Sequence, residues 1–206
     1  MNLNEHHDQA IKWMEKSINL IDGKDFETTL TSRVAVSLLH LSMEHSKAIC
    51  VLVGTDQTHG SALALLRPQF EALVRGLWMG RCASEEDANL FVKGKELKRI
   101  GKLILDIQNT DGYKNGTLMR QKGGLWDTLN DYTHNGAIQV KARNVGAEIK
   151  CNYSDEHIAW LLEISSKFSL LAAIEITRIA EDADLASNLI KAFKLIYAGY
   201  DEHEQL

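Results

Sequence analysis

Proline and cysteine are both scarce in this sequence. There is one proline, Pro68, among 206 residues, and it stands inside a segment that otherwise reads as one long amphipathic helix. The three cysteines, Cys50, Cys82 and Cys151, are far apart and include no CxxC pair. That pattern predicts reduced thiols in a cytoplasmic protein rather than a disulfide framework.

The common catalytic and cofactor motifs are also missing. The chain has no P-loop, GxGxxG, HExxH or GxSxG sequence, and no paired ExxH motif of a di-iron bundle. A net charge of -5 argues against a protein that coats nucleic acid generally, although it leaves room for a local basic patch. We therefore predict no metal and no cofactor.

Signals for a membrane or for export are absent from the pattern. The most apolar run, residues 158–180, is interrupted at helical spacing by charged residues, namely Glu163, Lys167, Glu175 and Arg178. A membrane span would not tolerate so many charges, so this run predicts a central helix of a bundle. The first residues have no basic segment and no apolar segment, and we expect a cytoplasmic protein with no membrane partner.

Helical periodicity is what the sequence does contain. Apolar residues recur with the period of an α-helix in seven segments, at about 3–21, 28–53, 57–82, 84–109, 125–136, 154–180 and 182–199. Only residues 144–153 lack this period, and they predict a short extended arm or hairpin. With no repeat or linker in residues 1–206, we predict one all-α domain, an antiparallel bundle of six or seven helices.

The segment around Pro68 combines a buried face with a polar one. Arg67, Glu71 and Arg75 follow at intervals of four and form a ladder of alternating charge. Pro68 cannot donate to the carbonyl of Ala64, so we expect a kink or a break just before it and a possible ligand site beside the freed carbonyl. The alternative is that Pro68 begins a new helix and the ladder only ties two helices together.

Basic residues form a second pattern in the segment 84–109. If that segment is one helix, Lys95, Lys98, Arg99 and Lys102 lie on one stripe opposite an apolar face. Such a stripe could bind phosphates. The alternative is an ordinary solvated face.

A third group of polar residues, which includes Asp131 and His134, lies at the end of the segment 125–136. Gly123-Gly124 predicts that helix begins near Leu125, and Asn135-Gly136 predicts its end, which leaves His134 in the last turn. Asp131 and His134 have a spacing that can hold one metal ion, although a single such pair is a weak signal.

These groups suggest a reaction if they converge. His134 could then move a proton while Arg67 holds an anionic phosphodiester, with Glu71 and Tyr132 beside them. If they do not form a site, His134 caps its helix and hydrogen-bonds Glu71 to lock the bundle. The residues alone are consistent with both interpretations, a proton-transfer site and a structural contact between helices.

The combination Arg67-Pro68-x-Phe70-Glu71, then Arg75-x-x-Trp78, then Asp131-Tyr132-x-His134 resembles bacterial families of unknown function that are similar to the HEPN group. That group (higher eukaryotes and prokaryotes nucleotide-binding) includes abortive-infection and toxin–antitoxin proteins. The resemblance covers mainly residues 57–143. It implies an antiparallel helical bundle, often a homodimer, which in active members is a metal-independent ribonuclease.

Active HEPN ribonucleases also carry an Arg followed a few residues later by a His, with a polar residue next to the Arg. Arg33 and His40 have a suitable spacing, but Val34 occupies the polar position. Our leading hypothesis is a HEPN-like homodimer of a defence or toxin–antitoxin system, with an antitoxin-type partner, that binds RNA or a nucleotide. Its site would contain Arg67, Glu71 and His134, with Arg75, Tyr132, Lys95 and Arg99 assisting. The alternative is a non-catalytic helical interaction module.

Overall fold

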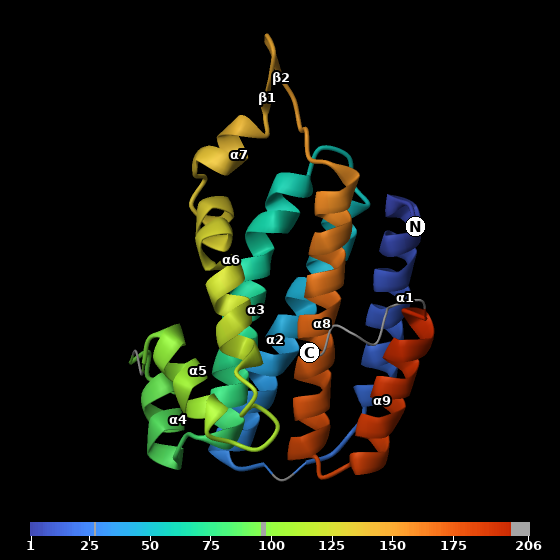
Figure 1. The fold of residues 1–206 in the computed structure, drawn as a ribbon. Coiled ribbons are helices and arrows are strands. Elements are labelled where there is room, and N and C mark those ends of the chain that lie inside the picture. Colours follow the sequence, from blue (N-terminus) through green and yellow to red (C-terminus); the bar gives the residue numbers. More distant parts are fainter. Residues whose placement is uncertain (27, 96–97, 199–206) are drawn as a thin grey trace.

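The computed structural model describes residues 1–26, 28–95 and 98–198. Its elements in chain order are α1 (Leu3–Ile21), α2 (Leu30–Val53), α3 (His59–Arg81), α4 (Glu85–Val92), α5 (Ile100–Gln108), α6 (Thr117–Thr133), α7 (Ala137–Lys141), β1 (Asn144–Val145), β2 (Glu148–Ile149), α8 (Asp155–Ile179) and α9 (Ala183–Ile196). Long helices run side by side, and the β1–β2 hairpin projects from one end of the bundle (Figure 1). The predicted all-α class and the predicted hairpin are both confirmed.

Several helix starts are fixed by side chains that the sequence offers as caps. Ser84 and Asp87 form a reciprocal capping box at the start of α4. The side chain of Ser154 accepts a hydrogen bond from the amide of His157 at the start of α8. The side chain of Asp182 accepts one from the amide of Leu185 at the start of α9. These side chains satisfy amide groups that have no partner within the helix, which is why the helices begin there.

Helix α3 passes through Pro68 without a break, so the predicted break is wrong, and so is the alternative in which Pro68 begins a new helix. The carbonyl of Ala64, which Pro68 leaves without a donor, lies 3.4 Å from the hydroxyl of Thr133 in α6. That hydroxyl also donates to the carbonyl of Leu129, at 2.8 Å. The neighbouring helix therefore contacts the interior carbonyl that Pro68 leaves open, and burial along α3 outweighs the local cost of proline, about 3 kcal/mol.

The segment 84–109 is two helices, α4 and α5, not the single helix that its periodicity predicts. The break leaves Lys95 and Lys98 outside both helices, with Arg99 as the N-cap of α5. No helical stripe of basic residues exists in the described part of this segment. Together with the short α7, the split raises the number of described helices to nine.

Helix α6 also differs from its prediction, because it continues through Gly123-Gly124 and begins at Thr117. Two glycines cost roughly 1 kcal/mol each in a helix. The turns on either side are anchored by Leu118 and Leu129, which are buried in the core. That packing outweighs the low helix propensity of the two glycines.

Helix α8 lies at the centre, in contact with α1, α2, α3 and α9. Within the apolar core it shares a polar cluster with α2 and α3: the hydroxyl of Ser165 lies 2.8 Å from Oε1 of Gln69 and 3.0 Å from the hydroxyl of Ser46. The Gln69 amide in turn donates to the carbonyl of Ser165. Each of these groups finds a partner, which is the condition for burying them without a large penalty.

Two helices, α2 and α8, have the length and apolar composition that would allow them to cross a membrane. Both are packed in the bundle, and α8 is buried over most of its most apolar window. The core helix of a globular protein meets the same criteria.

Helix α2 packs tightly against α3 at Gly76, where Leu39 leaves no room for a side chain, and this contact generates a prediction. A Cβ there would lie 2.7 Å from Cγ of Leu39, whereas one at Gly124 in α6 would meet nothing within 4 Å. Gly76→Ala should therefore destabilise the fold by about 1–3 kcal/mol through overpacking. Gly124→Ala should stabilise it by about 0.5–1 kcal/mol, because only the helix preference changes.

Urea unfolding followed by circular dichroism measures both variants. Equal and stabilising effects of the two substitutions would contradict the packing of α2 on α3 described here.

Candidate functional site

The polar ladder of α3 forms as its spacing predicts. Nε of Arg67 lies 2.9 Å from one oxygen of Glu71, and Nη2 of Arg75 lies 3.4 Å from the other. All three side chains are partly exposed. Glu71 thus bridges two arginines on successive turns.

His134 and Arg67 meet, as the convergence hypothesis requires. Nη1 of Arg67 lies 2.7 Å from Nε2 of His134, the C-cap residue of α6. A guanidinium can only donate hydrogen bonds, so Nε2 of His134 is the acceptor. The predicted alternative, a bond between His134 and Glu71, is not the one formed: Glu71 reaches His134 only through Arg67.

Trp126 of α6 holds two cations against its ring. The guanidinium carbon of Arg67 lies 5.1 Å from the ring centroid, and Nζ of Lys122 lies 4.9 Å from it. Neither Lys122 nor Trp126 is in the sequence prediction: Lys122 lies before the expected helix start near Leu125, and Trp126 lies inside the predicted helix but was not assigned to the site. Their spacing of four residues, and of eight from Trp126 to His134, marks one face of α6 once the helix is known to be continuous.

These side chains line an open cleft of about 490 Å³ between α3, α5 and α6. Five cationic side chains contribute to it: Arg67, Arg75, Arg99, Lys102 and Lys122. Glu71 is the one carboxylate among the described lining residues. The cleft is therefore strongly positive, although the chain as a whole is acidic.

Helix α5 turns its first residues toward this cleft. Ile100, Gly101 and Lys102 line it, and no side chain caps the amides of that first turn among the described residues. The amino end of a helix carries partial positive charge and free amide donors. The cleft thus adds a helix terminus to its cationic side chains.

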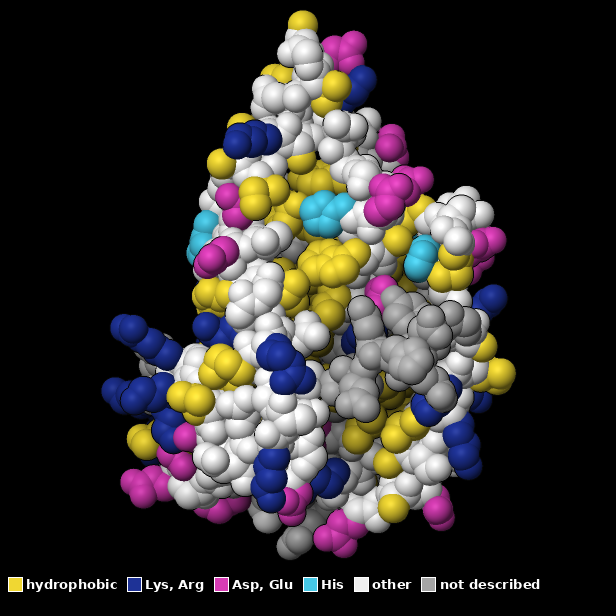
Figure 2. All heavy atoms as spheres, in the orientation of Figure 1, with side chains coloured by type: hydrophobic (Ala, Val, Ile, Leu, Met, Phe, Trp, Pro, Cys, Tyr) yellow, Lys and Arg dark blue, Asp and Glu magenta, His cyan; other side chains and the backbone are white. Residues whose placement is uncertain are grey.

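The other predicted basic residues lie elsewhere. Lys95 is exposed between α4 and α5 and is not among the described residues that line the cleft. Lys98 donates to Asp106 at 2.6 Å and lies 5.0 Å from the centroid of Trp78. The hydrogen bond from Lys98 lowers the pKa of Asp106. Figure 2 shows Lys and Arg side chains gathered over α4 and α5, beside the cleft.

Tyr132 is not part of the site, and its predicted role in ligand binding is wrong. Its side chain is 1% exposed in the core, and its hydroxyl lies 3.3 Å from Nε2 of His157 in α8. Burial raises the pKa of Tyr132 to about 12 and lowers that of His157. Tyr132 and His134 are two residues apart in a helical turn, so they point in opposite directions.

Asp131 has a structural task instead of the metal-binding one considered above. Its Oδ1 accepts hydrogen bonds from the amides of Ile138 and Gln139, at 2.9 and 3.2 Å, and so caps α7. A Cβ on Gly136 would lie 2.3 Å from the Asp131 carboxylate, so this turn needs glycine. Asp131 therefore orients the chain that leaves α6.

Arg33 and His40, the other Arg/His pair, are exposed on α2. Neither is among the residues described as lining the cleft. No hydrogen bond joins their side chains in the described part of the chain. The structure thus separates this pair from the site on α3, α5 and α6.

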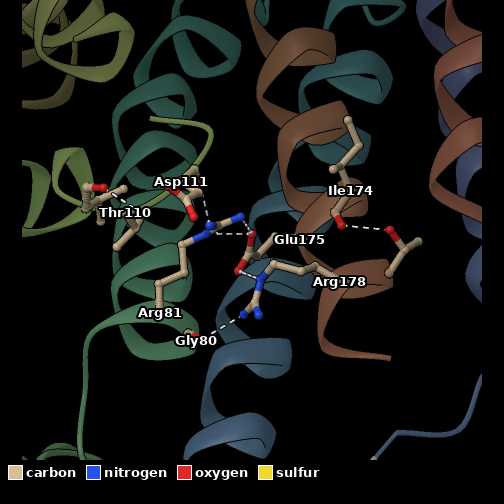
Figure 3. Close-up of polar contacts among 9 residues, drawn as sticks. Gly80, Arg81, Thr110, Asp111, Ile174, Glu175 and Arg178 are labelled. Atoms are coloured by element: carbon tan, nitrogen blue, oxygen red, sulfur yellow. Dashed lines mark hydrogen bonds and ion pairs between the residues drawn. The ribbon is translucent and has the colours of Figure 1, made fainter. Parts of the chain in front are cut away.

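A second arginine–glutamate cluster lies at the C-terminal end of α3 (Figure 3). Glu175 of α8 is 1% exposed; one of its oxygens accepts from Arg81 at 2.6 and 2.9 Å, and the other from Arg178 at 2.7 Å. Arg81 also donates to the carbonyl of Asp111, and Arg178 to that of Gly80. The cluster joins α3, α8 and the loop after α5.

This cluster is structural in its geometry, because Arg81 and Arg178 direct their hydrogen bonds to carboxylate and carbonyl acceptors of the protein. The sequence prediction treats Glu175 and Arg178 only as charges that interrupt an apolar run. Nothing local in the sequence pairs them with Arg81, which is 94 residues away from Glu175.

Replacing the buried carboxylate gives the second prediction. Glu175→Gln should lower the free energy of unfolding by about 3 kcal/mol, because it leaves two arginines without their counter-charge. The value lies at the lower end of the usual range because Arg178 is 43% exposed and stays partly hydrated. Asp111→Asn, at an exposed ion pair, should have no measurable effect on the same urea titration. Similar midpoints for wild type and Glu175→Gln would contradict this account.

The model of one protein family matches this chain over residues 39–199. It is described as a family of unknown function, DUF6988. The matched range includes every residue that lines the cleft. No curated protein and no solved structure matches the chain.

Proposed function

The chain belongs to DUF6988, a family of unknown function, and we propose that it binds a phosphate-bearing ligand, RNA or a nucleotide, in the cleft between α3, α5 and α6. One observation carries the proposal: five cationic side chains converge on a single cleft that has one described carboxylate. Clustered like charges repel one another, and an anionic ligand relieves that repulsion.

The side chain of Arg67 is preorganised to bind such a ligand. Its Nε is bonded to Glu71, its Nη1 to His134, and its guanidinium plane lies near the ring of Trp126. These contacts restrict a flexible side chain and leave Nη2 as a donor to the cleft. Restraint before binding lowers the entropy lost on binding.

The first turn of α5 supplies the second half of the proposed site. Phosphate groups bind at helix amino ends because free amides and the helix dipole both favour negative charge. Gly101 has no side chain to block that approach, and Arg99 and Lys102 flank it in sequence. A ligand phosphate can therefore sit between α5 and the arginines of α3.

The HEPN resemblance gives this binding a biological setting, which we keep as a hypothesis. In it the protein acts in the cytoplasm as part of a bacterial defence or toxin–antitoxin system, as a homodimer with an antitoxin-type partner. Metal-independent RNA cleavage would require His134 to move a proton. The described lining residues include no Ser, Thr or Cys that could serve as a nucleophile, so an RNA substrate would have to supply its own.

A second function, a non-catalytic interaction module, rests on a different observation. Arg67, Glu71 and His134 all have partners within the protein, and these bonds join α3 to α6. In that case the three residues stabilise the fold and the cleft has no ligand.

The third prediction tests binding. Arg99→Ala with Lys102→Ala should weaken binding of a labelled single-stranded RNA at least about tenfold, because two phosphate contacts are lost. The slope of log affinity against log salt should fall by about 1 to 2 for the same reason. Lys191→Ala, an exposed lysine on α9, serves as the control and should change neither quantity. Fluorescence anisotropy across a salt series measures both. If the wild-type protein binds neither RNA nor a nucleotide, the proposal is overturned.

The fourth prediction separates positioning from catalysis at His134. His134→Ala should weaken RNA binding up to about tenfold, since Arg67 loses one hydrogen-bond partner. His134→Gln keeps an acceptor near Arg67 and should restore most of the affinity. If His134 moves a proton, any cleavage should fall about 100-fold in both variants while binding is kept in His134→Gln. If His134→Ala lowers only the melting temperature, the interaction-module hypothesis stands.

A further inference from the structure

The projecting arm, which we define as residues 137–150, leaves apolar side chains in water. Ile149 is 84% exposed, Val140 54% and Ile138 41%. The hairpin extends away from the bundle, and its main contact is with α7 (Figure 1). A two-stranded hairpin is marginally stable alone in water, so a surface that covers these side chains would stabilise the arm.

A notch of about 430 Å³ opens at the same end of the molecule, between the starts of α1 and α8. Leu3, Ala159 and Trp160 give it apolar walls, and three carboxylates line it, Asp155, Glu156 and Glu163, with Met1 and His6 beside them. We call it the acidic notch. Figure 2 shows acidic side chains over the start of α8, near the base of the projection.

The arm and the acidic notch are complementary in charge. Lys141, Arg143 and Lys150 give the arm a positive net charge, because its one carboxylate is Glu148, which is paired with Lys150. Arg143 lies at the base of the arm, close to Gly60 and Tyr153. Asp155 and Glu156 of the notch are exposed, with no cation paired to either among the described ion pairs. The net positive charge of the arm therefore complements an apolar wall edged by carboxylates.

The arm cannot reach the notch of its own chain in this conformation. The amide of Lys150 donates to the carbonyl of Arg143 and that of Asn152 to the carbonyl of Ala142, which extends the pairing to the base of the hairpin. Folding the tip back onto α8 would break these bonds. An arm that fills the notch therefore comes from another molecule.

We propose that the arm of one copy of this chain docks in the acidic notch of a second copy, with Ile149 against Trp160. Because arm and notch lie at the same end of the bundle, a two-fold axis near that end makes the contact twice (Figure 1). The two contacts close a dimer and leave no free arm. This surface is distinct from the cleft, so the proposal does not depend on ligand binding.

The fifth prediction concerns the mass of the full chain in solution. Sedimentation equilibrium should show a wild-type dimer at a concentration of about 100 μM. Ile149→Asp should raise the dissociation constant at least about tenfold, because a charge replaces the apolar contact. Val92→Asp introduces the same charge at an exposed position of α4 and should leave the dissociation constant unchanged. Circular dichroism shows that each variant is folded.

A mixing experiment identifies the surfaces. Glu156→Lys should also be monomeric at concentrations where the wild type is a dimer, because it reverses the charge of the notch. An equimolar mixture of Ile149→Asp and Glu156→Lys should dimerise again, since one contact is intact and the other pairs Asp with Lys. A monomeric wild type, a dimer that survives Ile149→Asp, or folded variants that fail to associate when mixed would each overturn the proposal.

Discussion

The hydrogen bonds between Gln69, Ser165 and Ser46 fix how α3 sits in the bundle. Apolar contacts alone tolerate small rotations and slides of one helix on another, whereas a fully buried amide needs its partners at defined positions. Gln69 follows Pro68 and lies two residues from both Arg67 and Glu71. Holding Gln69 inward therefore holds Arg67 and Glu71 toward the cleft, so the core cluster sets the orientation of the site.

Two arginine–glutamate clusters on α3 show how surroundings decide what the same side chains do. Around Glu175 the arginines find carboxylate and carbonyl acceptors within the protein, and little is left to contact a ligand. Around Glu71, further cations from α5 and α6 join the pair in an open cleft, and no second carboxylate balances them among the described lining residues. The first arrangement holds helices together. The second leaves positive charge facing solvent.

The sequence predicts the fold class well because periodicity reports which face of each segment is buried. It fails where tertiary packing opposes a local preference: α3 continues through Pro68, and α6 through Gly123-Gly124. The meeting of Arg67 with His134 is predictable as a hypothesis from a polar helix face and a polar helix end. Lys122 is missed because it joins the site only when α6 is continuous, and Trp126 is missed because an aromatic ring inside a predicted helix gives no local sign of its two cation contacts. Tyr132 is misassigned because its side chain points into the core, away from that of His134.

The contact between the Thr133 hydroxyl and the carbonyl of Ala64 joins α6 to α3, two of the helices that form the cleft. Helix α3 has one turn that is incomplete by itself, and the group that completes it comes from α6. A chain in which α6 has not yet docked would have both a frayed turn at Pro68 and an Arg67 without His134 or Trp126. The docking of α6 therefore serves two ends: it places a hydroxyl against the open carbonyl of α3, and it brings His134 and Trp126 to Arg67.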